Sequence, residues 1–125
     1  MVQDDLMYTK EHEWVKVEGD VATIGITDFA QQQLGDIVYV ELPSPGTRVE
    51  FMKAFGTVEA VKAVSDLYSP VTGEVVGVNS DLGADPAAIK SSPYGRGWMI
   101  KVKLEAKQEL AKLMTAAAYR QLVGD

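Results

Sequence analysis

The sequence predicts one mostly β domain, a sandwich or small barrel, with a short internal helix and a helical tail. Its 125 residues are a length typical of a single domain. Short β-branched segments recur between glycine, proline and aspartate turn signals, as in small β architectures. After residue 104 the apolar spacing becomes helical. We therefore place a β core at about residues 8–104 and a C-terminal helix at about 105–123.

The strands are predicted from alternation and β-branching. Residues 12–18 alternate, residues 21–26 are β-branched, and Gly19-Asp20 between them is a turn signal, so the two segments predict a hairpin. Further strands are predicted at residues 37–42 and 98–104, and residues 71–78 predict a turn followed by a strand. Residues 58–64 could locally form a helix, and nothing in their spacing singles out Lys62.

A short helix is predicted after the first hairpin. Thr27 or Asp28 can cap its N-terminus, and Asp28 with Gln31 resembles a capping box. Gly35 fits the left-handed position that ends a helix. In the tail, an apolar stripe is expected to lie on the β core and to cover a sheet edge. The stripe consists of Leu110, Leu113, Met114, Ala117 and Leu122.

Composition excludes several classes of function. The chain has 18 acidic and 12 basic residues, net charge −6, no cysteine and a single histidine, His12. An acidic chain lacks the positive field that nucleic acid or an anionic membrane requires. Without cysteine there is no disulfide, thiolate metal site or cysteine nucleophile. We expect His12 to be a surface or partly buried residue, and we expect no catalytic or metal-binding residue.

Charge and terminal patterns add two expectations. Residues 1–66 hold 12 acidic and five basic residues, so the acidity belongs to the first half of the chain. The N-terminal residues show no secretory or transit signal, and no apolar run approaches the roughly 20 residues of a membrane helix. A cytoplasmic protein without membrane contact is therefore predicted.

Five segments carry a resemblance to a known family. They include His12-Glu13-Trp14 near the N-terminus and a stretch around Lys62, and they occur at residues 8–15, 25–31, 34–43, 58–75 and 92–99. In this order they resemble the glycine cleavage system H proteins, the lipoyl carriers of that system. The match runs from about residue 8 to residue 104.

The resemblance implies a lipoyl-domain-like fold, a flattened barrel-sandwich hybrid with added helices. It places Lys62 at the tip of a β-hairpin, which displaces the helical alternative there. It also implies that lipoic acid is attached to Lys62 through an amide bond. Glu13 and Asp66 match the positions that line a cleft for the loaded arm, where carboxylates would pair with a protonated amine.

The function implied by the resemblance is that of a non-catalytic carrier. A pyridoxal-phosphate glycine decarboxylase would load an aminomethyl group onto the arm. A tetrahydrofolate-dependent aminomethyltransferase would remove it, and dihydrolipoamide dehydrogenase would reoxidise the dithiol. A lipoylating enzyme completes the set of partners. The arm would make each delivery effectively intramolecular.

The sequence departs from the family pattern at two places and leaves alternatives open. Ala60 replaces the usual serine before Val61, and residues 88–91 differ from the usual stretch. A lipoyl carrier or relay protein for another pathway is one alternative. A biotin carboxyl carrier is less favoured, because Val61 and Ala63 flank Lys62 where methionines would be expected. A plain interaction module with unmodified Lys62 is the third.

Overall fold

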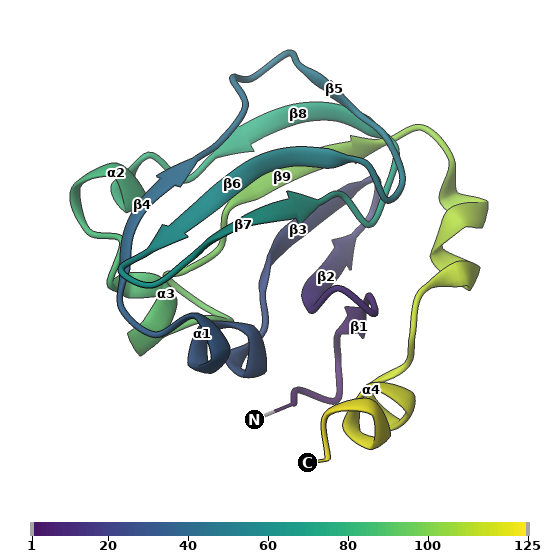
Figure 1. Ribbon diagram of the computed structural model, residues 1–125. Coiled ribbons are helices and arrows are strands. Elements are labelled where there is room, and N and C mark those ends of the chain that lie inside the picture. The colour runs from purple at the N-terminus through teal and green to yellow at the C-terminus, as the bar shows by residue number, and fades with distance from the viewer. Residues whose placement is uncertain (1, 125) are drawn as a thin grey trace.

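The computed structural model describes residues 2–124, whose nine strands form two sheets that lie face to face (Figure 1). The first sheet contains, in spatial order, β1 (Met7–Tyr8), β2 (Glu13–Glu18), β3 (Val21–Ile26), β9 (Ile100–Leu104), β8 (Gly73–Val78) and β5 (Arg48–Val49). The second contains β4 (Ile37–Glu41), β6 (Ala54–Ala60) and β7 (Val64–Tyr68). Each neighbouring pair is antiparallel. The predicted β sandwich is confirmed.

The core lies between the two sheets. Val58 and Leu67 of the second sheet pack in one buried cluster with Ile26 and Met99 from the first-sheet side of the molecule. A separate cluster is formed mainly by the inward residues of β2, β3, β8 and β9. Because Val58 and Leu67 point into the core, alternation leaves their neighbours Glu59 and Asp66 outside it, half-buried and exposed respectively.

The first hairpin forms as predicted. β2 and β3 pair from Glu13 with Ile26 to Glu18 with Val21, and Gly19 in the turn has φ +62°. Gly25 lies directly under the Trp14 ring, where an added Cβ would come within 2.7 Å of three ring atoms. The Trp14 indole also donates a hydrogen bond to the carbonyl of Pro93, 2.9 Å away. The absence of a side chain at Gly25 therefore leaves the space in which the Trp14 ring is buried.

The internal helix α1 (Asp28–Leu34) begins and ends at predicted residues. The Thr27 hydroxyl caps it by accepting from the Ala30 amide at 3.2 Å. Gly35 ends it as predicted, but with φ +79° and ψ −140° it is not in the predicted left-handed helical conformation; this is another region that only glycine adopts readily. The Gln31 side chain bonds to the Asp28 side chain, so the predicted capping box between these two residues does not form.

The prediction of one C-terminal helix over residues 105–123 is wrong. A 3-10 helix, η1 (Lys107–Lys112), is followed by an extended segment and then by α4 (Ala116–Val123), capped by Thr115. Met114 interrupts the helix because its N–H and C=O pair with Tyr8 on β1, at 2.7 and 2.9 Å. The tail thereby covers the edge of the first sheet, as expected.

The predicted apolar stripe on the tail is also partly wrong. In α4 the buried residues are Ala116 and Tyr119, whereas Ala117 and Leu122 are exposed. Because the helix starts again after Thr115, the residues of α4 that face the core differ from those that one continuous helix would bury. The Tyr119 ring stacks on the Tyr8 ring with centroids 4.5 Å apart.

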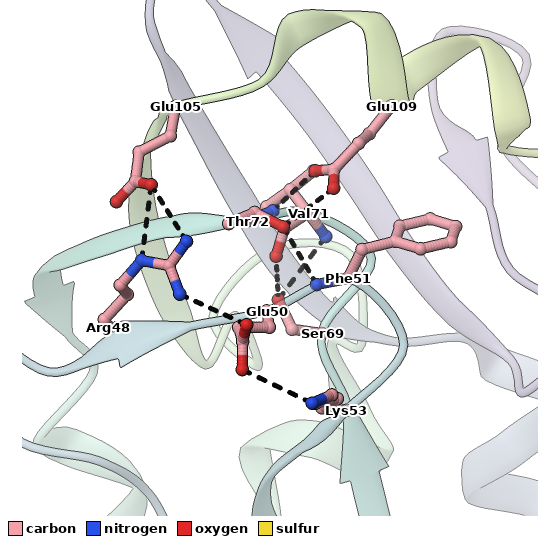
Figure 2. A network of polar contacts seen from close by, with 9 residues as sticks. All are labelled: Arg48, Glu50, Phe51, Lys53, Ser69, Val71, Thr72, Glu105 and Glu109. Carbon is pink, nitrogen blue, oxygen red and sulfur yellow. Dashed lines mark hydrogen bonds and ion pairs between the residues drawn. The ribbon is translucent and has the colours of Figure 1, made fainter.

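A polar network fixes η1 and the residue Glu105 before it to β5 and to the turn that leads into β8 (Figure 2). The Glu109 carboxylate accepts from the Thr72 amide at 2.9 Å and from the Thr72 hydroxyl at 2.8 Å. The Thr72 hydroxyl accepts in turn from the Phe51 amide. Arg48 bridges Glu50 and Glu105 at 3.2 Å each. These contacts attach η1 and the residues before it to β5 and to the turn before β8.

Some short elements were not predicted. They are β1, β5 and the one-turn helices α2 (Asp81–Ala84) and α3 (Ala88–Ser91), and β9 begins at Ile100, two residues later than predicted. Within residues 2–124, none of the helices has the length and hydrophobicity that crossing a bilayer would require.

Replacing Gly25 with alanine should destabilise the fold by about 1–3 kcal/mol, because the new methyl group overlaps the Trp14 ring. Gly83→Ala is the matched control: it lies in α2 with open space around it, so it should be neutral or slightly stabilising. Urea unfolding of the two variants tests this. Equal midpoints would show that Trp14 does not need the space.

Candidate functional site

Lys62 lies at the tip of the β6–β7 hairpin, as the resemblance implies. The ladder ends at Glu59 with Val64, and the Ala60 amide closes the turn on the carbonyl of Ala63 at 2.7 Å. All three turn residues, 61 to 63, are exposed. The Val61 amide donates to the carbonyl of Asp36 at 3.0 Å, which ties the tip to the segment between α1 and β4.

The side chain of Lys62 lies back against the body of the protein. A Cβ atom placed on Gly35 would be 3.8 Å from Cε of Lys62. Among residues 2–124 no ion pair or side-chain hydrogen bond involves Lys62. Its amine is therefore accessible, and modifying it breaks no interaction within this part of the chain.

The two departures from the family pattern do not disturb the tip. Ala60 is buried, 5 % exposed, and pairs with Ile37 of β4. Lys90, from the divergent stretch, forms an exposed ion pair with Asp36 at 3.1 Å. Such a pair contributes little stability, but it keeps a second amine beside the tip engaged with a carboxylate.

A cleft of about 290 Å³ begins beside this tip. Leu34, the last residue of α1, lines it, and Lys62 rests over the neighbouring Gly35. The other lining residues come from α1, β3, β6, β7, the first residue of β2 and the turn that leads into β2. They are Glu11, His12, Glu13, Ile26, Phe29, Ala30, Gln33, Val58, Ser65, Asp66, Leu67 and Tyr68. The volume is near the lower end for small-ligand pockets.

The structure brings Glu13 and Asp66 into this one cleft although they are far apart in sequence. Asp66 is exposed on β7, whereas Glu13 is 2 % exposed. Glu13 Oε1 accepts from the Thr9 hydroxyl at 2.5 Å, and Oε2 accepts from the Tyr68 amide at 3.2 Å. Burial raises the pKa of Glu13 to about 7, against the lowering effect of these two hydrogen bonds.

The charges that line the cleft are of one sign. Glu11, Glu13 and Asp66 are acidic, and none of the described lining residues is lysine or arginine. The remaining wall is largely apolar, contributed by α1 and β3. No three acidic or histidine side chains in residues 2–124 are grouped so as to hold a metal ion. The cleft is therefore suited to a cation at the end of an apolar chain.

His12 is a partly buried residue, as predicted. Its Nδ1 lies 2.8 Å from the Tyr119 hydroxyl, and its ring packs 4.8 Å from the ring of Phe29. The Tyr119 hydroxyl also bonds to the Thr27 side chain at 2.7 Å. Burial lowers the pKa of His12. The residue thus joins α4 to α1 and supports one wall of the cleft.

Thr9 is the residue at this site that the sequence did not single out. Its hydroxyl accepts from the amides of Glu11 and Glu13, 3.2 Å away in each case, and donates to the Glu13 carboxylate. A threonine whose hydroxyl bonds the amide two residues ahead is a common turn motif, and that spacing was the available signal.

The chain is similar to one protein family over nearly its whole length. Residues 6–125 match the family model described as glycine cleavage H-protein. A glycine cleavage system H protein of Chlorobium phaeobacteroides is 51 % identical over 98 % of both chains. A protein of the same name from Staphylococcus carnosus is 51 % identical over 99 % of this chain and 98 % of its own.

The fold has a similar solved counterpart. The crystal structure of a glycine cleavage system H protein from Mycobacterium marinum aligns with a TM-score of 0.92 at 38 % identity. The alignment covers 99 % of this chain and 100 % of that one. The agreement includes the arrangement of strands that carries the hairpin and the cleft.

The buried carboxyl of Glu13 should make stability depend on pH. Its folded pKa of about 7 lies above the usual 4.5, so it stabilises the fold most below pH 4.5 and loses that contribution as pH rises to 7. Glu13→Gln removes this loss. The stability of the variant relative to the original should rise by up to about 3 kcal/mol between pH 4 and pH 8. Urea unfolding at both pH values tests this, and a constant difference contradicts it.

Proposed function

The chain belongs to the glycine cleavage H-protein family, and we propose that it carries a lipoyl group on Lys62. Proteins of this family act as lipoyl carriers in the glycine cleavage system. One observation carries the assignment of the site: an accessible lysine at an exposed hairpin tip lies over Gly35, whose neighbour Leu34 lines an acidic, apolar-walled cleft.

Lys62 suits an amide-linked arm. Amide formation removes its positive charge, and no described acidic partner would be left unpaired. When bound, a lipoyl group supplies a dithiolane whose sulfurs accept and hand on a one-carbon unit. The chain has no cysteine, so no protein thiol competes in thiol–disulfide exchange with that group.

The cleft lies within reach of an arm on Lys62. Asp66 is four residues from Lys62 along the hairpin, roughly 13 Å at 3.3 Å per residue, and Tyr68 lies beyond it. We infer that Glu13 and Asp66 hold the cationic end of the loaded arm here. The apolar wall from α1 and β3 excludes water around it, which strengthens the charge pairing.

In this proposal the chain is a carrier and a shuttle substrate without turnover of its own. Its arm visits glycine decarboxylase, the aminomethyltransferase and dihydrolipoamide dehydrogenase, after a lipoylating enzyme has attached it. Tethering raises the effective concentration of the arm at each partner. The acidic surface gives no support to nucleic acid as a partner. A cytoplasmic location is part of the same proposal.

We further propose that partner enzymes dock on the outer side of the second sheet. Four of the six large apolar side chains exposed within residues 2–124 gather around the hairpin tip, namely Val38, Tyr39, Val61 and Val64. Tyr39, Glu59 and Val64 are in register across the three strands, and paired residues share a face. An apolar patch with acidic neighbours fits a partner surface that is apolar with a basic rim.

Attachment to Lys62 can be measured directly. After expression with lipoate and a lipoate ligase, intact mass spectrometry should show the gain of one lipoyl group. Lys62→Arg should abolish the gain, whereas Lys90→Arg, beside the tip, should keep it. An unmodified protein, or a gain that persists in Lys62→Arg, would overturn the assignment.

Docking on the second sheet can be tested with two exposed valines. Val64→Ser should raise the KM of glycine decarboxylase for the lipoylated protein by about three- to tenfold, because an apolar contact at the interface is lost. Val76→Ser, on β8 of the first sheet and 48 % exposed, should leave KM unchanged. Equal effects of the two substitutions would place docking elsewhere.

A further inference from the structure

The carboxylate of Glu13 is held at two points by groups that can only donate. Oε2 accepts from the Tyr68 amide, which has no acceptor capacity. Oε1 accepts from the Thr9 hydroxyl, which has one hydrogen and two acceptor sites. Both acceptor sites are taken by the amides of Glu11 and Glu13 at 3.2 Å. The hydroxyl hydrogen is therefore directed at Glu13.

Thr9 is placed to do this by the turn that it closes. Its amide donates to the carbonyl of Glu13 at 3.0 Å, and its carbonyl accepts from the His12 amide at 3.1 Å. His12, in the same turn, has φ +72°, a conformation uncommon for a residue with a side chain. Thr9 itself is 3 % exposed. The turn thus aims one buried hydroxyl at one buried carboxylate.

We propose that Thr9 is a positioning residue, which keeps the Glu13 carboxylate oriented and charged to receive the cationic end of the arm. Both donors favour the ionised carboxyl, whereas burial favours the neutral one. With both donors present, burial already raises the pKa of Glu13 to about 7. Without Thr9 one donor is lost, so the pKa rises further and less of Glu13 is ionised at neutral pH. This inference rests on the proposed function of the cleft.

Of the two groups that donate to Glu13, only the Thr9 hydroxyl can be removed by a substitution. Glu11 from the same turn and Asp66 from β7 oppose a negative charge, and the Tyr119 phenol of α4 is also within electrostatic range. Among the described lining residues His12 is the one that could become cationic, and burial lowers its pKa. The residues of α1 and β3 that line the cleft are uncharged. The Tyr68 donor is backbone and cannot be removed by substitution of its side chain.

The first test needs no lipoyl group. Carbon NMR of the Glu13 carboxyl is followed against pH in the full chain, in Thr9→Val and in Thr9→Ser. A hydrogen bond to a charged group is worth roughly one to two pKa units, so Thr9→Val should raise the pKa of Glu13 by about that much. Thr9→Ser keeps the hydroxyl and should not. If the valine variant does not fold, Thr9→Ala replaces it.

The second test uses lipoylated protein loaded with the aminomethyl group. At pH 7 the load should be lost about tenfold faster from Thr9→Val than from Thr9→Ser, and the difference should shrink towards pH 9, as a growing fraction of Glu13 becomes ionised in the valine variant. A purely structural role would change the rate equally at all pH values and would overturn the proposal. So would an unchanged pKa in Thr9→Val.

The two proposals fail in different ways. If Glu13→Gln speeds loss of the load but Thr9→Val does not, the cleft keeps its proposed function and Thr9 is not its positioning residue. If neither substitution affects the loss, the proposed role of the cleft is wrong, and the positioning role falls with it.

Discussion

The hydrogen bond from the Tyr68 amide to the Glu13 carboxylate joins the two sheets where the cleft ends. β7 is an edge strand, whose outward amides need partners other than a neighbouring strand. One of them is satisfied by a side chain at the start of β2. This carboxylate is buried, and none of the described residues that line the cleft beside it is lysine or arginine. A positive charge that enters the cleft is therefore favoured.

The strands were predictable because their signals are local. The alternation in β2 and the glycine turn after it agree with the register of the β2–β3 hairpin, and Thr27 and Gly35 bound α1 as their chemistry dictates. The tail was mispredicted because its phase depends on a distant partner. Met114 pairs with Tyr8, more than a hundred residues away, and no periodicity within residues 105–123 contains that contact.

The site was less predictable than the fold. The spacing of residues gave no reason to choose Lys62, because a residue exposed at a hairpin tip does not belong to a periodic pattern. Lys62 was chosen from the family resemblance alone. Resemblance also named Glu13 and Asp66, but it did not reveal that one is buried and the other exposed. That difference depends on the local turn that Thr9 closes and on the edge strand β7, whose Tyr68 amide bonds to Glu13. The second contact is tertiary and leaves no signal in the local spacing.

The difference in burial suits a carrier that must hold its load and also give it up. A hydrogen bond to a charged group contributes about 1.5–3 kcal/mol. One such bond between Glu13 and the arm would favour the arm bound in the cleft over the arm free in solvent by roughly ten- to 150-fold. That preference would shelter the load for most of the time between encounters. It is still small compared with the binding energy that an active site can apply. If Asp66 were buried as deeply as Glu13, a second desolvated carboxylate would raise the pKa of both, and the cleft would be neutral when it needs charge. One buried carboxylate held by donors, with a second left in water, therefore gives retention that remains reversible.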